Sequence, residues 1–312
     1  MNKSNNIFLN KTFSSLLILT MMMACPLFTK ASHFKTTVKG VIYSNSILED
    51  SASDKDLKRS KRLLIEIYKK IQKNTNKKTY SFSYNNARFQ IVIVNTIYND
   101  LKILPNTTGK LQGLDYQFVQ NPTATVLMNA GMFEANGAPV GLLISGQKQI
   151  NKINLKKDLP GNFYSMKNAI FYVDIDGKYY VKNSISFNEK FKNKYQEILY
   201  ATQSGPILTS EGKINKDFSE NSTNKLIRNG IGVVENSKNN IAIFIIAQTP
   251  CSFFDMASLF KNLGCDNSMY LDGSVSRLFY KHSNNIKEKP KSGDMKLGPV
   301  FSVTPKVNPV LH

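Results

Sequence analysis

Residues 241–273 read IAIFIIAQTPCSFFDMASLFKNLGCDNSMYLDG and decide the fold. The run from Ile241 to Ala247 is almost wholly apolar, as expected of a strand that is buried on both faces. Helical spacing of apolar residues follows from Ser252 to Leu263, and Gly264 is a typical residue just past a helix end. Residues 269–271 then predict a short strand. The segment therefore predicts a buried strand, a helix and a second strand.

Strands dominate the neighbouring sequence as well. Phe89 to Val94 and Ala124 to Met128 are rich in apolar or β-branched residues. Ile170 to Val173 and Tyr179 to Val181 flank an Asp-Ile-Asp-Gly sequence that is typical of a hairpin turn. We find no regular alternation of strands and helices, no internal repeat and no Gly-rich nucleotide loop. These features predict an α+β fold with a mixed, largely antiparallel β-sheet core and flanking helices.

The N-terminal residues 1–32 have the features of an export signal. Positive charge precedes an apolar stretch from Leu16 to Phe28, which is too short to span a bilayer comfortably, and small residues suited to a signal peptidase follow. A lipoprotein form acylated at Cys25 is the less favoured alternative, because Pro26 follows directly. We therefore expect an exported protein of the periplasm or the extracellular space.

The rest of the chain divides by composition. Apolar residues recur at helical spacing between Asp54 and Lys73, with Lys and Arg on the other face. This basic helix is expected to pack on the main domain, although contact with an anionic membrane is an alternative. The expected divisions are a signal peptide (1–32), an N-terminal basic helical segment (33–87), a main domain (88–304) and a C-terminal tail (305–312).

The formal net charge of +19 admits three interpretations: a nucleic-acid binder, a protein of an acidic envelope surface, or a Lys-rich compositional bias. The Lys residues lie beside Asn and Ser, and no zinc-finger, RNA-binding or helix-turn-helix pattern is present. Export also argues against nucleic acid as a partner. We interpret the charge as a solvated basic surface, which leaves peripheral contact with an anionic envelope surface open.

Residues for His-based chemistry are scarce. The three His residues are His33, His282 and His312, so a His triad or a three-His zinc site is disfavoured and acid–base work falls to carboxylates. Cys251 and Cys265 are separated by the predicted helix and should lie about 20 Å apart. A disulfide tolerates only about 7 Å between Cα atoms, so both should be free, buried thiols.

Four Gly-containing clusters stand out, although each alone is ordinary turn chemistry. They are Asn129-Ala-Gly131-Met-Phe, Gln203-Ser204-Gly-Pro, Arg228-Asn-Gly-Ile-Gly and Tyr270-Leu-Asp272-Gly273-Ser274-Val-Ser276. Their order, together with Pro139-Val-Gly-Leu142, Gly161-Asn-Phe163 and Phe254-Asp255, closely resembles the phosphodiester glycosidase family, with its N-acetylglucosamine-1-phosphodiester alpha-N-acetylglucosaminidase-like domain. The resemblance is closest to a bacterial periplasmic branch and covers roughly residues 89–302.

The resemblance implies a hydrolase that cleaves a glycosyl phosphodiester at the anomeric C–O bond. The leaving group is a phosphate monoester with a second pKa of about 6, so strong general-acid help is less necessary. Asp272 is the expected carboxylate, which attacks the anomeric carbon or activates water, and Arg228 is the expected phosphate clamp. The expected partner is a carbohydrate phosphodiester substrate. No cofactor is predicted, and a divalent cation on the phosphate is an open alternative.

Further residues are candidates for substrate binding. Hydrogen bonds to sugar hydroxyls or to phosphate are expected from Asn129, Gln203 and Ser204, and the resemblance adds Gly131, Gly273, Ser274 and Ser276. Asp255 has two equal interpretations, a site residue or a helix cap paired with Ser252. Glu134 is interpreted as an exposed loop carboxylate.

One departure from the family affects the turn after Asp272. Ser274 and Val275 stand where the better-known branch carries a Gly-rich run, so the sugar stays open. The same departure, with the basic charge, supports the alternative of a non-catalytic protein that binds envelope glycans or phosphopolymers.

Overall fold

The computed structural model describes residues 35–38, 41–44, 66, 69, 78–106, 111–192, 194–235, 240–281, 290 and 295–307. The predicted signal peptide lies outside these residues. So does most of the predicted basic helix, of which Glu66 and Lys69 are described and are helical.

The described strands form four sheets, and the order of strands in each is as follows. The seven-stranded sheet contains β13 (Lys213–Ile214), β12 (Ile207–Ser210), β16 (Asn267–Tyr270), β14 (Asn229–Glu235), β15 (Asn240–Ala247), β4 (Ala87–Asn95) and β3 (Lys78–Tyr84). The four-stranded sheet contains β17 (Leu278–Tyr280), β6 (Val126–Asn129), β18 (Val300–Pro305) and β5 (Asn99–Leu104). The five-stranded sheet contains β10 (Tyr179–Asn183), β9 (Ala169–Asp174), β11 (Ile198–Ser204), β7 (Leu143–Ser145) and β8 (Lys148–Asn151).

The remaining elements are few and short. A two-stranded sheet pairs β1 (Lys35–Val38) with β2 (Val41–Ser44). The described helices are α2 (Leu114–Gln120), α3 (Asn162–Ser165), α4 (Ser184–Phe191) and α5 (Phe253–Asn262), with the 3-10 turns η2 (Tyr195–Glu197) and η3 (Gly273–Val275). None of these helices is both long and apolar enough to cross a membrane.

The predicted fold class is confirmed in part. Strands dominate, and every pairing between the described strands is antiparallel, where a mixed sheet was expected. Antiparallel strands need no crossover helix, which accounts for the small helical content.

The apolar run at 241–247 forms β15, which lies between β14 and β4 and is buried on both faces. Side chains alternate along a strand. Ile241, Ile243 and Ile245 therefore face α5, and they join its apolar residues in one cluster. Ala242 and Phe244 face the other way, into a cluster shared with the four- and five-stranded sheets. The seven-stranded sheet thus separates two cores.

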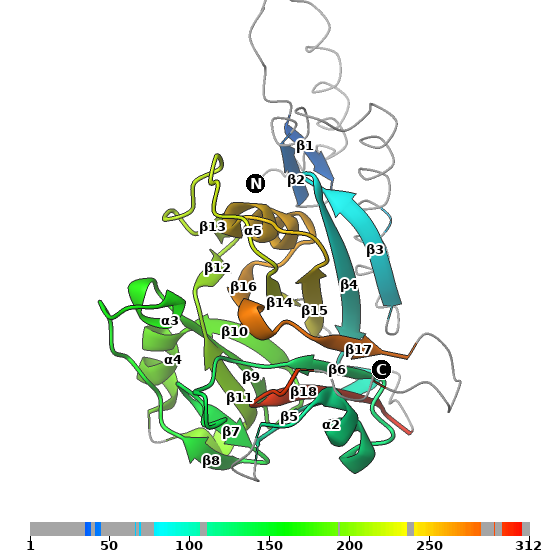
Figure 1. Ribbon diagram of the computed structural model, residues 1–312, viewed down its shortest axis with the longest axis vertical. Helices are drawn as coiled ribbons and strands as arrows, with labels where there is room; N and C mark the ends of the chain where they lie inside the picture. The colour runs from blue at the N-terminus through cyan, green and yellow to red at the C-terminus, as the bar shows by residue number, and fades with distance from the viewer. Residues whose placement is uncertain are drawn as a thin grey trace, which may run out of the picture.

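Smaller clusters cover the outer faces of the other two sheets. The five-stranded sheet packs on α4 through Phe187 and Phe191. The four-stranded sheet packs on α2 through Leu114. Figure 1 shows the result, with α5 covering one side of the seven-stranded sheet and α2 beside β6 and β18.

Local predictions for the central segments agree with the structure. The hairpin of β9 and β10 turns at Asp174, whose Oδ1 accepts hydrogen bonds from two backbone N–H groups, and Gly177 has φ +75°. The helix predicted at 252–263 is α5, and Gly264 follows it with φ +86°. Cys251 and Cys265 are free and buried, as expected.

The described sheet extends beyond the expected main domain at its N-terminal side. Strand β3 begins at Lys78, ten residues before the expected boundary at 88, and pairs along its full length with β4. Its pairing partner is the next strand in sequence, so the two form a hairpin at the sheet edge.

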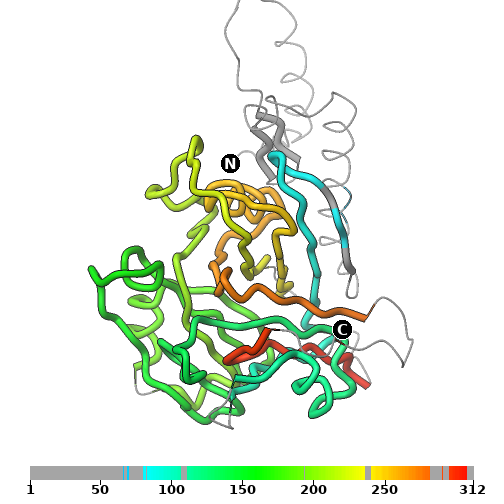
Figure 2. The backbone as a smooth tube through the Cα atoms, viewed as in Figure 1, coloured from blue at the N-terminus to red at the C-terminus, as the bar shows by residue number. Residues whose placement is uncertain are grey.

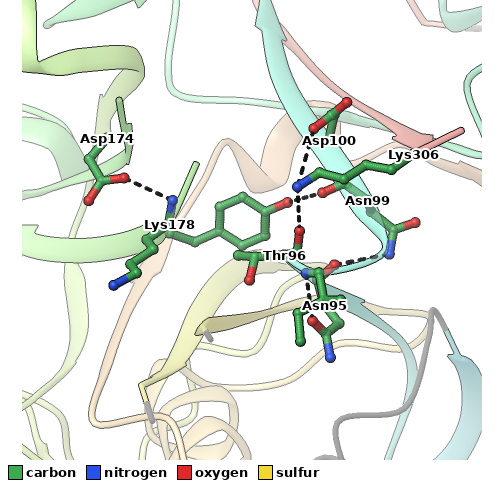
Figure 3. A network of polar contacts seen from close by, with 9 residues as sticks. Asn95, Thr96, Asn99, Asp100, Asp174, Lys178 and Lys306 are labelled. Carbon is green, nitrogen blue, oxygen red and sulfur yellow. Dashed lines mark hydrogen bonds and ion pairs between the residues drawn. The ribbon is translucent and has the colours of Figure 1, made fainter. Parts of the chain in front are cut away.

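A polar network ties the β4–β5 turn to two other segments (Figure 3). The Tyr179 hydroxyl donates to the Asn99 carbonyl at 2.9 Å, and Asn240 Nδ2 donates to the Tyr179 carbonyl at 2.7 Å. Lys306 Nζ donates to the Thr96 carbonyl at 2.9 Å and lies 3.8 Å from Asp100 Oδ1. This network attaches β10 and the chain after β18 to one turn of the central sheet.

We expect Tyr179→Phe to destabilise the protein by about 1–3 kcal/mol, because the substitution removes the buried hydrogen bond from the Tyr179 hydroxyl to the Asn99 carbonyl. Tyr179 is 1% exposed, so water does not replace the lost hydroxyl. Urea denaturation of the purified protein measures the difference. The control is Tyr116→Phe at a side chain that is 41% exposed, where the change should stay within about 0.5 kcal/mol. Equal effects at the two positions would contradict the prediction.

Candidate functional site

Three strand termini meet where the four-stranded and seven-stranded sheets adjoin. Asn129 is the last residue of β6, Asn229 is the first of β14, and Asp272 follows β16. Asn229 Nδ2 donates to Asn129 Oδ1 at 2.7 Å, and Asn129 Nδ2 donates to the Asp272 carbonyl at 3.1 Å. Asn129 and Asp272, two candidate residues that lie far apart in sequence, are thus brought together.

The Asn129 amide is fully enclosed. Its Oδ1 also accepts from the Arg277 backbone N–H at 3.0 Å, and the side chain is 0% exposed. Asn129 therefore positions the turn after β16 from inside the protein. Asn229 is equally buried, and its own Oδ1 has no hydrogen-bond partner among the described residues.

The Asp272 carboxylate lies at the start of a tight turn. Its backbone is extended, with φ −91° and ψ 99°, and its Oδ1 accepts from the Ser274 N–H at 3.3 Å. Burial raises the pKa of this carboxyl above its ordinary value, and the Ser274 N–H opposes the rise. Asp272 is therefore a half-buried carboxylate with increased basicity.

The turn that follows requires a glycine at Gly273. A Cβ there would lie 2.2 Å from the Tyr270 hydroxyl oxygen and 2.8 Å from the Ile227 carbonyl oxygen. The Gly273 N–H donates to the same Tyr270 hydroxyl at 2.8 Å. Ser276 Oγ closes the turn by donating to the Gly273 carbonyl at 2.9 Å, whereas Ser274 is exposed.

Arg228 is almost completely buried, with 1% of its surface exposed. Its Nε donates to the Cys251 carbonyl at 2.9 Å, and its Nη2 donates to the carbonyl and the side-chain oxygen of Asn224, at 3.0 and 3.3 Å. The guanidinium carbon lies 3.6 Å from the centre of the Phe253 ring. Arg228 is therefore an interior residue that is held by main-chain acceptors and an aromatic ring.

The charge of Arg228 has no carboxylate in ion-pair contact within the described chain, and its Nη1 is buried without a hydrogen-bond partner there. Burial lowers the pKa of the guanidinium, while the nearby Tyr270 and Cys251 side chains oppose that shift. A buried, incompletely paired cation is costly, which is typical of a site built for an anion.

Arg228 directly precedes β14 and Asp272 follows β16 by two residues, so both lie just beyond the same end of two neighbouring strands. Gly230 pairs with Tyr270, and the Leu271 N–H donates to the Asn229 carbonyl at 3.1 Å. One step further, this register sets Arg228 opposite Asp272. Paired residues in an antiparallel ladder share a face, so both side chains start from the α5 side.

Tyr270 lies between these two residues. Its ring is 4.9 Å from that of Phe253 and 5.8 Å from the Arg228 guanidinium carbon. Burial raises the pKa of the phenol, and the Gly273 N–H and the Arg228 charge oppose the rise. Tyr270 therefore remains protonated near neutral pH and joins the guanidinium to the Gly273 turn.

Gln203 has a structural role. Its Oε1 accepts from the Leu142 and Asn154 N–H groups, both at 2.9 Å. Its Nε2 donates to the Asn154 carbonyl at 2.6 Å and to Asn168 Oδ1 at 3.0 Å. All the hydrogen-bonding capacity of the amide is used, so Gln203 has none left for a substrate.

Gly131 and Ser204 lie beside Gln203. A Cβ on Gly131 would lie 2.3 Å from the Gln203 carbonyl oxygen, and its N–H donates to Thr202 Oγ1 at 3.1 Å. Ser204 is 0% exposed, and its Oγ has no partner within the described segments. Gly131 thus allows close contact between two sheets.

Asp255 caps α5. Its Oδ2 accepts from the Ser252 N–H and hydroxyl at 2.9 and 2.8 Å, and Ser252 Oγ accepts from the Asp255 N–H at 3.0 Å. Its Oδ1 accepts from Asn85 Nδ2 at 2.9 Å. The geometry is that of a helix cap. Glu134 is an exposed loop residue, as predicted.

Sequence reasoning passed over Asn229, Tyr270 and Phe253. Asn229 stood within a quoted cluster, and Tyr270 preceded Leu271-Asp272, so both had a sequence signal. Phe253 had none, since an aromatic residue at a helix start is ordinary. Among the described residues, no group of three or more His, Cys, Asp or Glu side chains is placed to hold a metal ion.

Known proteins resemble both the sequence and the fold. The chain is 35% identical over 174 residues to the uncharacterised protein YigE of Escherichia coli strain K12, and this match covers 55% of the chain and 65% of that relative. The structure is similar to the catalytic domain of zebrafish N-acetylglucosamine-1-phosphodiester alpha-N-acetylglucosaminidase, auto-inhibited by its pro-peptide. The TM-score is 0.50 and the identity 13%, over 73% of this chain and 82% of that one, so this likeness concerns the fold.

Residues 122–304, more than half of the chain, match the sequence profile of the family described as phosphodiester glycosidase. The matched region contains Asn129, Arg228 and Asp272. The chain therefore belongs to the phosphodiester glycosidase family.

Proposed function

We propose that this chain hydrolyses a glycosyl phosphodiester at the bond between the anomeric carbon and the bridging oxygen, with Asp272 as the catalytic carboxylate. The observation that carries the proposal is the position of Asp272. It lies half-buried beside the end of β6, the start of β14 and the end of β16, within the family's matched region. The sugar-phosphate substrate class rests on the family.

In the proposed reaction, water supplies a hydroxyl group to the anomeric carbon, and the electron pair of the broken C–O bond leaves with the phosphate. The product phosphate monoester is a good leaving group, with a second pKa of about 6, so little protonation of the bridging oxygen is needed. Asp272 takes the proton of the attacking water, or attacks the carbon before water does. Both forms require the ionised carboxylate.

Arg228 is the proposed cation on the phosphate side. Two of its three nitrogens already donate to Cys251 and Asn224, and Nη1 has no partner in the described chain but is buried, so a phosphate oxygen reaches Nη1 only after the residues that cover it move. Bidentate binding of phosphate through Nη1 and Nη2 therefore requires that Asn224, an exposed residue, release Nη2. The buried setting strengthens the attraction between the cation and the phosphate.

Export and surface association belong to the same proposal. The N-terminal residues support an exported protein, and the charge of +19 supports contact with anionic envelope material. The same charge favours one alternative, a non-catalytic binding protein for envelope phosphopolymers. Binding of such polymers without any turnover by the purified protein would select that alternative.

We expect Asp272→Asn to lower kcat at least about 1,000-fold while the protein stays folded, because Asn is also a good capping residue for the Ser274 N–H. Release of reducing sugar from a sugar-1-phosphodiester measures the activity. Asp176→Asn, in the exposed β9–β10 turn, is the matched control and should keep full activity. An Asp272→Asn variant with normal kcat would end the assignment.

The raised pKa of Asp272 predicts the pH dependence of the reaction. Activity should be lost as the pH falls through a midpoint above the ordinary range of Asp, because protonation removes the reacting carboxylate.

The folded state also binds this proton more tightly than the unfolded state, so protonation stabilises the fold. Thermal unfolding should therefore show Asp272→Asn to be no less stable than wild type at pH 7, with any gain shrinking in acid. A marked loss of stability at pH 7 would contradict this prediction.

Arg228→Lys should lower kcat/KM about 10- to 100-fold, since Lys keeps the charge but loses the planar stacking on Phe253 and the fixed donors. Release of reducing sugar from a sugar-1-phosphodiester is again the assay, with unfolding measured in parallel. Arg88→Lys at an exposed position is the control. Unchanged kinetics in Arg228→Lys would remove Arg228 from the site.

A further inference from the structure

Two adjoining cavities lie near β12, which is the neighbour of β16 in the seven-stranded sheet. One has a volume of about 500 Å3 and lies against β12, β13 and the start of α4. The other, of about 210 Å3, lies against α3 and the loop before it. Both are lined by Lys167, Asn183, Ile185 and Asp217, so they form one continuous groove. Figure 1 shows α3 and α4 on the same side of the molecule as β12, and Figure 2 shows the same backbone as a tube.

The groove is lined by five lysines, so we name it the lysine groove: Lys156, Lys157, Lys167, Lys213 and Lys216. All five are exposed, and none forms an ion pair with a carboxylate in the described part of the chain. The lining also contains three carboxylates, Asp158, Glu189 and Asp217. Positive charge therefore exceeds negative charge around the groove.

The remaining lining suits sugar hydroxyls. It contains the hydroxyls of Ser186 and Ser210 and the ring of Tyr164. The amides of Asn183 and Asn215 also line it, and both bind backbone groups of the lining. Amides and carboxylates bind hydroxyl groups by hydrogen bonds, whereas ammonium groups bind phosphate. The three carboxylates would repel a densely charged polyanion. The mixture fits a glycan that carries scattered phosphates better than it fits nucleic acid or polyphosphate.

The groove is joined to the candidate site through rigid structure. The Ile207 N–H donates to the Lys167 carbonyl at 2.8 Å, and the Tyr270 N–H donates to the Pro206 carbonyl at 3.0 Å. Ile207, which lines the groove, pairs with Met269. Asp217 of the lining is followed by Phe218, whose ring lies 5.2 Å from that of Phe253, and the Arg228 guanidinium carbon lies 3.6 Å from the same Phe253 ring. One aromatic pair therefore separates the groove lining from the proposed phosphate-binding cation, so a substrate longer than one sugar phosphate extends from the site towards the groove.

We propose that the lysine groove binds the part of a phosphate-bearing glycan that extends beyond the scissile bond, and so selects polymeric or oligomeric substrates. This inference rests on the proposed function for the position of the scissile bond. The binding itself does not require catalysis. A short sugar-1-phosphodiester needs Asp272 alone, whereas a longer phosphorylated chain gains affinity from the groove.

The test compares two triple variants in the full chain. Lys167→Gln, Lys213→Gln and Lys216→Gln neutralise the groove. Lys102→Gln, Lys148→Gln and Lys296→Gln remove the same charge at exposed positions outside the groove lining. Each triple is made in the Asp272→Asn background for calorimetric binding, and in the wild-type background for turnover. The probes are a phosphorylated oligosaccharide, the same oligosaccharide without phosphate, inorganic polyphosphate, and a sugar-1-phosphate methyl diester.

We expect the groove triple to weaken binding of the phosphorylated oligosaccharide about 10- to 100-fold and the control triple to weaken it at most about 2-fold. Turnover of the methyl diester should change less than about 2-fold in both. Equal losses in the two triples would show a bulk charge effect and overturn the proposal, as would tighter binding of polyphosphate than of the oligosaccharide, or no oligosaccharide binding. Failure of the proposed hydrolysis would instead appear as absent turnover of the methyl diester with oligosaccharide binding intact.

Discussion

The hydrogen bond from Asn229 to Asn129 is the constraint on which the candidate site depends. It joins the start of β14 to the end of β6, and so fixes the seven-stranded sheet against the four-stranded one. Apolar packing between the sheets is strong but has no direction, and it does not set the position of one strand end to within a fraction of an ångström. A second hydrogen bond, from Asn129 to the Asp272 carbonyl, fixes the position of the turn that carries the carboxylate. Amide geometry thus aligns a reactive group by its main chain and leaves its side chain available.

On the other face of the same strands, a helix start and a buried cation are linked. The capping box of Ser252 and Asp255 fixes the first turn of α5, and the next residue, Phe253, stacks on the Arg228 guanidinium. The two interpretations of Asp255 are therefore connected, since a helix cap at this place also sets the aromatic surface on which the cation lies. Burying Arg228 without a carboxylate costs stability, and Phe253, Asn224 and the Cys251 carbonyl offset part of that cost. Functional sites often lower the stability of the folded protein in this way.

Local chemistry made part of the fold and site predictable from sequence. Period and run length indicated β15, the β9–β10 hairpin and α5, because these signals come from neighbouring residues. The division of strands among sheets, and β3 at the sheet edge, depend on contacts between distant segments, which a pattern does not contain. At the site, Asp272 and Asn129 were identified as candidates and lie together. Gln203 carries an amide that would suit a sugar hydroxyl, but in the structure this amide bonds only to other parts of the protein. The sequence does not contain the surroundings that distinguish a sugar-binding amide from a structural one.

The close packing around Gly273 also limits which residues this turn accepts. A side chain at that position would meet the Tyr270 hydroxyl and the Ile227 carbonyl at once, and one of these contacts is with main chain that cannot move aside. Substitution is therefore blocked at Gly273 itself. The next residue, Ser274, is exposed and is the place in this turn where another side chain fits without disturbing the strand ends.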